Sequence, residues 1–223
     1  MSQTYGKTRW KRFALVMVPS VAATAMVGVS IANSALAASF SISGQQFKVS
    51  TTHLEGSHFA QFGTVDIEAS GQPHPVAVSA FDSADITNLC QSVVTDLSGF
   101  GLGKITLQLN AGGPGSKPVH ADNLLIDLEQ LKADATFKNI NIGQDASTLS
   151  GAATQGWKPH QKVTDAGGGK GLPTGATGFA QAADSAILDN VQQTARATSA
   201  GNFVLSGLNL SLKKGDGPGI ECF

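Results

Sequence analysis

The chain has little of what most catalytic and metal sites are made from. Charged residues make up 14% of its 223 positions, and there are two cysteines, two tryptophans and one tyrosine. No Gly-x-Ser-x-Gly pentapeptide is present, so the sequence lacks the sharp nucleophile turn of the α/β-hydrolases. We therefore name no catalytic residue, no cofactor-binding residue and no metal ligand, and we expect no cofactor.

Two weak candidates for chemistry remain around the histidines. Ser57 stands beside His58, but adjacent side chains of an extended segment point to opposite faces, which prevents a nucleophile and base pair. His53 and His58, with Glu55 between them, offer a sparse set of metal ligands, whereas zinc needs three or four that converge. Surface histidines near a turn explain this spacing more simply.

Paired carboxylates are the other chemistry open to this sequence, because glycoside hydrolysis uses two of them. The candidates are Asp66, Glu68, Asp122 and Asp127, which all lie where polar and apolar residues alternate. This alternation predicts that the four carboxylates lie on the solvent side of strands.

Long apolar runs are also scarce, and the one that exists lies near the N-terminus. Four basic residues within the first twelve are followed by an uncharged segment, residues 13–37, that ends in Ala35-Leu36-Ala37. This pattern predicts a secretory signal cut between Ala37 and Ala38, and a secreted or cell-surface protein. The alternative is an uncleaved anchor, because a membrane span needs about 20 residues. We expect contact with a membrane only through this segment, if it is kept.

Positive charge is in short supply once the signal is removed. The four basic residues of residues 1–37 leave 11 Lys and Arg against 16 Asp and Glu, a net charge of −5. Nucleic acid is excluded as a partner, since phosphate binding needs clustered positive charge. An apolar small molecule or a component of the cell envelope is the kind of partner that we expect. The remaining 186 residues (223 minus 37) predict a single domain, residues 38–223.

The two cysteines, Cys90 and Cys222, are most simply interpreted as one disulfide of an exported protein. Closing so long a loop stabilises a fold by roughly 4–5 kcal/mol in the chain-entropy model. Two free buried thiols are the alternative.

Helical periodicity is rare, and strand periodicity dominates. In KITLQLN, residues 104–110, apolar and polar side chains alternate, and the same alternation recurs in most other segments. Residues 179–197 alone also have helical spacing. The predicted fold is all-β, sandwich-like or barrel-like, with internally repeated strand units, and a short irregular β-helix is the alternative.

The strand units repeat in sequence. ADNLLIDLEQLKADAT, starting at Ala121, and ADSAILDNVQQTARAT, starting at Ala183, agree at seven of sixteen positions, and ADITNLCQSVV, starting at Ala84, is a weaker copy. Because the second copy runs into a strand-like segment, the repeat favours strand over helix for residues 179–197. We interpret the unit as a pair of strands entered through Ala-Asp.

Residues 151–178 are rich in glycine and have no periodicity. They predict a long exposed loop. Trp157, the one tryptophan after the signal, is interpreted as a hydrophobic pin for this loop, with a contact for sugar or lipid as the alternative.

Several segments together resemble a known family. FSISGQQFKVSTTHLEG, GTVDIEASGQPHPVAVSAF, NLCQSV, ADATFKNINIGQDAS and the final ECF are similar to exported proteins of high-GC actinobacteria, notably streptomycetes, which are classed as a domain of unknown function. Some members carry the label cholesterol esterase. The resemblance implies the same positions for Cys90 and Cys222 and defines no catalytic residues.

These observations lead to one expected function and two alternatives. We expect an exported, non-catalytic structural or binding protein of the cell envelope or extracellular space. The alternatives are a protein that binds lipid or another apolar ligand, and a sterol or lipid ester hydrolase with an unrecognised site.

Overall fold

The computed structural model describes residues 44–68, 70–149 and 178–223. The expected signal segment, its cleavage site at Ala37 and Ala38, and Trp157 with nearly all of the glycine-rich loop lie outside the described residues. Among the described residues no helix is long and apolar enough to cross a lipid bilayer.

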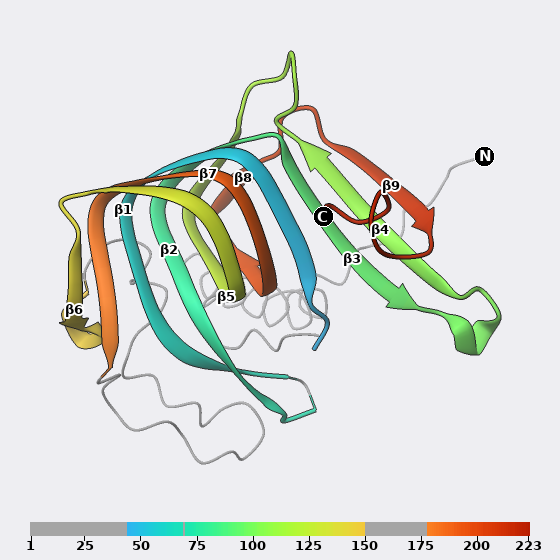
Figure 1. The fold of residues 1–223 in the computed structure, drawn as a ribbon, viewed down its shortest axis with the longest axis horizontal. Helices are drawn as coiled ribbons and strands as arrows, with labels where there is room; N and C mark the ends of the chain where they lie inside the picture. Colours follow the sequence, from blue (N-terminus) through green and yellow to red (C-terminus); the bar gives the residue numbers. More distant parts are fainter. Residues whose placement is uncertain (1–43, 69, 150–177) are drawn as a thin grey trace, which may run out of the picture. The chain divides into compact units, whose positions relative to one another are not determined.

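The described chain forms one antiparallel sheet, in the order β6-β7-β5-β2-β1-β3-β4-β9, with β8 paired to β5 (Figure 1). The strands are β1 (Phe47–Ile67), β2 (Pro73–Thr87), β3 (Leu89–Asp96), β4 (Lys104–Ala111), β5 (Val119–Lys138), β6 (Asn141–Asp145), β7 (Phe179–Ser199), β8 (Asn202–Val204) and β9 (Asn209–Lys214). This confirms the all-β prediction. The β-helix alternative is wrong, because all of these pairings are antiparallel.

Four long strands close into a ring. β1 pairs with β2, β2 with β5, β5 with β7, and β7 again with β1. The curved strands of this ring are visible in Figure 1. Their inward faces form the main hydrophobic core, to which all four strands contribute buried side chains.

Aromatic side chains fill the middle of the ring. Phe59 lies between Phe81 and Phe137, with ring centroids 5.3 and 5.0 Å apart. Gly56 is required beside them, because a Cβ atom there would lie 2.3 Å from the Phe81 ring. A side chain at residue 56 would therefore displace the aromatic core.

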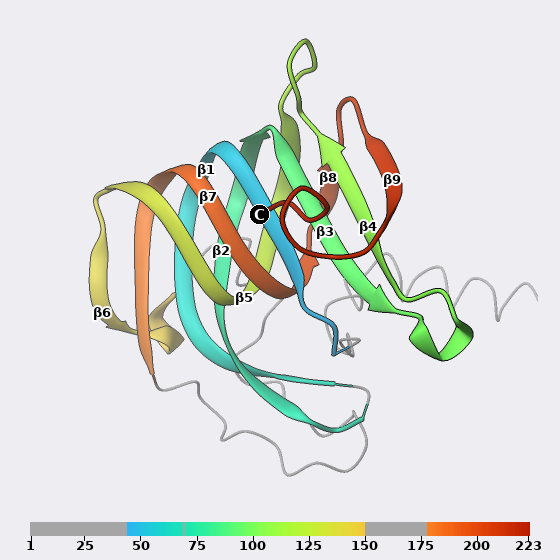
Figure 2. The ribbon, with the colours of Figure 1, turned by 45° about the vertical axis from the view of Figure 1, so that its right-hand side comes forward.

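Three strands extend beyond the ring, and we call β3, β4 and β9 the wing. β3 follows β2 directly after Asn88, whose φ of 55° lies in the left-handed region. The first residues of β1, Phe47–Ser50, pair with β3 on one side and with β7 on the other. Through β1 the wing and the ring are parts of one continuous sheet (Figure 2).

The sequence repeat corresponds to single strands, so its interpretation as a pair of strands is wrong. Residues 121–136 lie within β5 and residues 183–198 lie within β7. Because β7 is a strand, residues 179–197 do not form a helix. The Ala-Asp pairs lie inside strands and do not begin them. Their alanines, Ala84, Ala121 and Ala183, are buried, and Ala84 pairs with Ala121. Small inward side chains let opposite walls of the ring approach, while the aspartates point outward.

Candidate functional site

A row of side chains crosses the sheet from the inside of the ring to the edge of the wing. Gln193 of β7, Val49 of β1, Gln91 of β3, Leu109 of β4 and Leu210 of β9 are successive cross-strand partners. Directly opposite residues share one face of a sheet. The face that lines the ring is therefore the same face that the wing exposes.

A second row runs beside the first. It consists of Ala195, Phe47, Val93, Leu107 and Leu212, in the same strand order. Ala195 is fully buried in the ring, whereas Leu212 at the outer edge is 73% exposed. All five side chains of the row are apolar, and they differ in how far other parts of the chain cover them.

We call the exposed part of this surface the leucine face. Its members are Leu107, Leu210 and Leu212, together with Leu208 by the alternation of the strand and Phe203 at the junction with the ring. Their exposed fractions range from 36% to 73%. Large contiguous apolar patches on a protein surface are typical of interaction sites.

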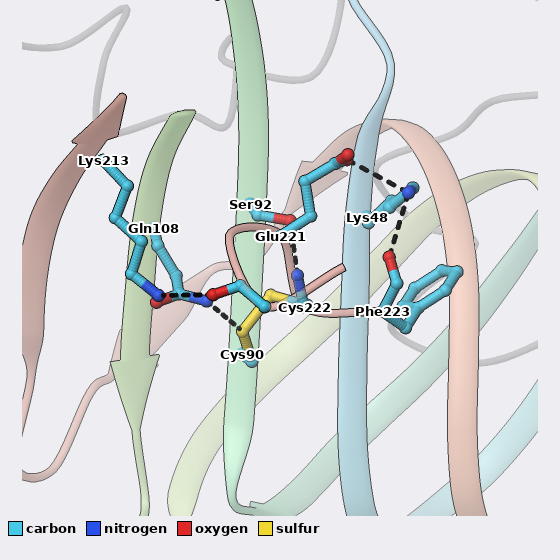
Figure 3. The surroundings of a disulfide bond; sticks show 9 residues. Lys48, Cys90, Ser92, Gln108, Lys213, Glu221, Cys222 and Phe223 are labelled. Carbon is cyan, nitrogen blue, oxygen red and sulfur yellow. Dashed lines mark hydrogen bonds and ion pairs between the residues drawn. A yellow bond between two sulfur atoms is a disulfide. The ribbon is translucent and has the colours of Figure 1, made fainter. Parts of the chain in front are cut away.

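The opposite face of the wing is covered by the C-terminal tail, residues 215–223. Cys90 on β3 and Cys222 in the tail lie at disulfide distance, with 2.01 Å between the two Sγ atoms (Figure 3). The Cys222 amide donates to Ser92 Oγ at 3.1 Å, and Thr106 Oγ1 donates to the Gly215 carbonyl at 2.6 Å. Ser92 and Thr106 are fully buried beneath the tail.

The tail is also attached to the ring strand β1. Lys48 Nζ lies 3.1 Å from a Glu221 carboxylate oxygen and donates to the Phe223 carbonyl at 2.9 Å (Figure 3). Its ammonium group also lies 5.2 Å from the centroid of the Phe223 ring. One face of the wing is thus covered by polar contacts and a disulfide, while the other is left apolar and open.

A small pocket opens where the leucine face enters the ring, and we call this place the ring mouth. The lining residues are Val49, Thr51, Leu54, Ile86, Leu89, Gln91, Leu124, Ile126, Val191, Gln193, Thr198 and Phe203. The cavity has a volume of about 30 Å³. This space suits one or two waters or the end of an apolar chain, whereas drug-sized ligands occupy roughly 300–1,000 Å³.

The sequence repeat builds both sides of this mouth. Asn88 and Asn190 each adopt a left-handed backbone conformation, with φ of 55° and 52°. Each is followed three residues later by a glutamine, Gln91 or Gln193, and these glutamines flank Val49 on its two sides. The weak third copy of the repeat, which starts at Ala84, already indicated this correspondence in sequence, because it aligns Asn88 with Asn190 and Gln91 with Gln193.

The structure brings together three of the four carboxylates considered from sequence. Arg196 lies 3.4 Å from Glu68 and acts electrostatically on Asp66, which in turn acts on Asp127. Its guanidinium also bonds to Glu129. Asp122 lies elsewhere, 3.2 Å from His120.

Asp66 and Asp127 lie on the outer face of the ring, as the alternation predicted, but they are half-buried there and not open to solvent. Burial raises the pKa of Asp127 to about 7, and the neighbouring Asp66 adds repulsion. Burial also raises the pKa of Asp66, against the opposing effects of Arg196 and His74. The predicted exposure was wrong, although the predicted face was right, because the outer face of the ring carries a second small core around Phe62 and Val78.

The histidines bond to carboxylates. Nδ1 of His53 lies 2.7 Å from Asp189 and Nδ1 of His58 lies 3.1 Å from Asp82, so the two histidines have separate partners. Within the described ranges, no group of three or more His, Cys, Asp or Glu side chains is arranged to hold a metal ion.

Comparison with known proteins gives a family and no function. No curated protein and no solved structure matches the chain significantly. Residues 43–223 match DUF6230, described as a family of unknown function, and the chain therefore belongs to that family.

Proposed function

We propose that this chain is an exported, non-catalytic binding protein of the cell envelope or extracellular space, and that it makes contact through the leucine face. The observation that carries the proposal is that one face of the wing is covered and the other is exposed. The tail and its disulfide cover one face, and the leucines of the other remain exposed.

The energetics favour a contact role for these leucines. Burying a leucine or phenylalanine side chain stabilises a protein by about 1.5–3 kcal/mol relative to leaving it exposed. The exposed parts of these five side chains, which are largest at Leu210 and Leu212, are therefore apolar surface that a partner could bury.

Two features support export. Disulfides persist in oxidising compartments and are rare in the cytosol, and here one holds the tail in place. The N-terminal segment has the pattern of a secretory signal. The resemblance to exported actinobacterial proteins agrees with both.

Binding of a lipid or another apolar small molecule is a second candidate, favoured by the pocket at the ring mouth. The volume of about 30 Å³ limits this role, because the pocket accepts only one end of such a molecule. The rest would lie on the leucine face. An ester hydrolase finds little support, because a catalytic histidine must also bond to a nucleophile. The ring nitrogens of the described histidines, His53, His58, His74 and His120, bond to carboxylates and have no serine hydroxyl as a partner.

The proposal is tested by replacing two leucines and a control residue. Leu210→Glu with Leu212→Glu places charge on the leucine face, and Ile142→Glu places it on β6, at the opposite edge of the sheet, where Ile142 is also exposed. Each variant is expressed with its N-terminal segment in an actinobacterial host. Culture medium and envelope extract are then separated by size without reductant.

We expect the wild type and Ile142→Glu to be exported and to elute in complexes larger than one chain. The double variant should be exported and elute as a single chain. Retention in the cytosol would contradict export, and an unchanged complex in the double variant would contradict the assigned surface.

A further inference from the structure

We infer that the occupant of the leucine face is a second copy of this chain, so that two wings pack face to face and antiparallel. This inference rests on the proposed binding role of the face. In this arrangement the tip of each wing, at Phe100 and Leu102, lies against the ring mouth of the other copy.

The available area matches a dimer. Phe100 is 84% exposed and Leu102 is 56% exposed, at the turn between β3 and β4. Large apolar side chains present about 150–200 Å² each when fully exposed, so the tip and the leucine face together offer on the order of 700 Å². A standard protein interface buries about 800 Å² on each partner.

The charges favour an apolar partner over an anionic surface. Lys214, opposite Ile105, is the one charged residue in the wing's described strands that shares the side of the leucine face. Lys104 and Lys213 lie on the side of the tail, where Lys104 bonds to Asp216 at 2.7 Å. An anionic membrane or a strongly charged protein would find no complementary cluster here.

The ring determines the orientation of the two copies. Because the inside of the ring continues the leucine face, the walls formed by β2 and β5 stand on that same side of the sheet. Two wings packed in parallel would bring these walls into collision. Antiparallel packing places each wall beyond the other copy's tip, and it keeps the two Lys214 side chains at opposite ends.

The first experiment is sedimentation velocity of the protein purified from culture medium, with its disulfide intact. We expect a concentration-dependent dimer of the wild type and of Ile142→Glu. Leu210→Glu with Leu212→Glu should weaken self-association at least tenfold. Thermal melting of each variant shows whether the fold is retained, and Leu212→Ala, which adds no charge, serves as a milder second variant.

The second experiment determines the orientation. A photo-cross-linking amino acid replaces Phe100, and mixed isotope labelling separates cross-links between chains from those within one chain. We expect cross-links from the tip to residues 203–210 of the other copy. Cross-links from tip to tip would overturn the antiparallel arrangement.

The two proposals fail in different ways. A purified wild type that stays a single chain at high micromolar concentration would overturn the second-copy inference. If the same protein still elutes in larger complexes from envelope extract, the binding role of the face stands and its occupant is another molecule. A co-purifying lipid that reacts with the cross-linker would overturn the second copy in favour of an apolar ligand.

Discussion

Leu107 and Leu212 are cross-strand partners on β4 and β9, and both are exposed although they continue a row that is buried inside the ring. The inner members of that row, Phe47 and Ala195, belong to or pack against the main core. The same apolar face thus serves as core at one end and as free surface at the other. This continuity is the basis of the proposed binding role.

The first prediction separates surface leucines from core residues. Leu212→Ala should change the free energy of unfolding of the isolated chain by less than about 0.5 kcal/mol, because the side chain is exposed. Phe81→Ala, inside the ring, should cost about 3–5 kcal/mol. Urea denaturation at low protein concentration measures both. A large loss in Leu212→Ala would mean that the leucine is part of the core.

The second prediction concerns Asp127, whose pKa burial raises to about 7. A raised pKa means that the folded chain holds a proton that the unfolded chain has released, so this contribution to stability is lost as the pH rises from about 4 to 7. Asp127→Asn should therefore match the wild type near pH 3.5 and exceed it at pH 8. After allowance for solvent screening, the gain should be about 1–3 kcal/mol.

The control for this measurement is Asp122→Asn, because Asp122 lies beside His120 and away from the buried carboxylates. Denaturation in urea from pH 3.5 to pH 8 gives the comparison. Equal pH dependence in Asp127→Asn and wild type would show that Asp127 is ionised in the folded protein throughout.

The third prediction concerns Arg196. Its side chain is 8% exposed and neutralises Glu68 and Glu129, while its Nη1 donates to the Gly44 carbonyl at 3.2 Å. Arg196→Met removes this charge from the partly exposed Glu68 and Glu129 carboxylates, and because solvent screens them the loss of stability should be about 1–3 kcal/mol. Burial raises the pKa of Asp66 and Arg196 opposes this rise, so without Arg196 the pKa of Asp66 should rise further. The loss of stability should therefore be larger at pH 8 than at pH 4. A loss independent of pH would indicate a packing effect.

The fourth prediction concerns the tail. Cys222→Ser opens the disulfide that spans 132 residues, and the loss of stability should approach about 4–5 kcal/mol. Buried Ser92 and Thr106 would then exchange their amide protons faster, together with the rest of β3 and β4. Hydrogen exchange by mass spectrometry checks this. Unchanged exchange in the wing would show that hydrogen bonds and Lys48 hold the tail without the disulfide.

Sequence patterns predicted the strands well, but they predicted poorly which strand faces are exposed to solvent. The alternation in KITLQLN places Leu107 and Leu109 on one face of β4, as the register confirms. Alternation defines which side chains share a face, and it says nothing about what packs against that face. For this reason the sequence alone could not predict that Leu107 is exposed or that Asp127 is half-buried.

Local sequence patterns also could not predict that the four long strands close into a ring. It depends on β1 pairing with β7 as well as with β2, and the partners in β1 and β7 are more than a hundred positions apart in sequence. The repeat contained part of this information, since Asn88 and Asn190 bend two strands beside Val49. The role of these two asparagines in the fold depends on the register of a third strand, β1, which lies outside the repeat.

The most direct test of whether the leucine face is a contact surface is hydroxyl-radical footprinting of the protein in its native culture medium and envelope extract. The reference is the purified chain, diluted until it is a single chain. We predict slower oxidation of Leu210 and Leu212 in the native samples, with equal oxidation of Ile142 and Phe179, which are exposed at the opposite sheet edge. Equal oxidation of the two leucines in all samples would contradict the claim that the leucine face is a contact surface.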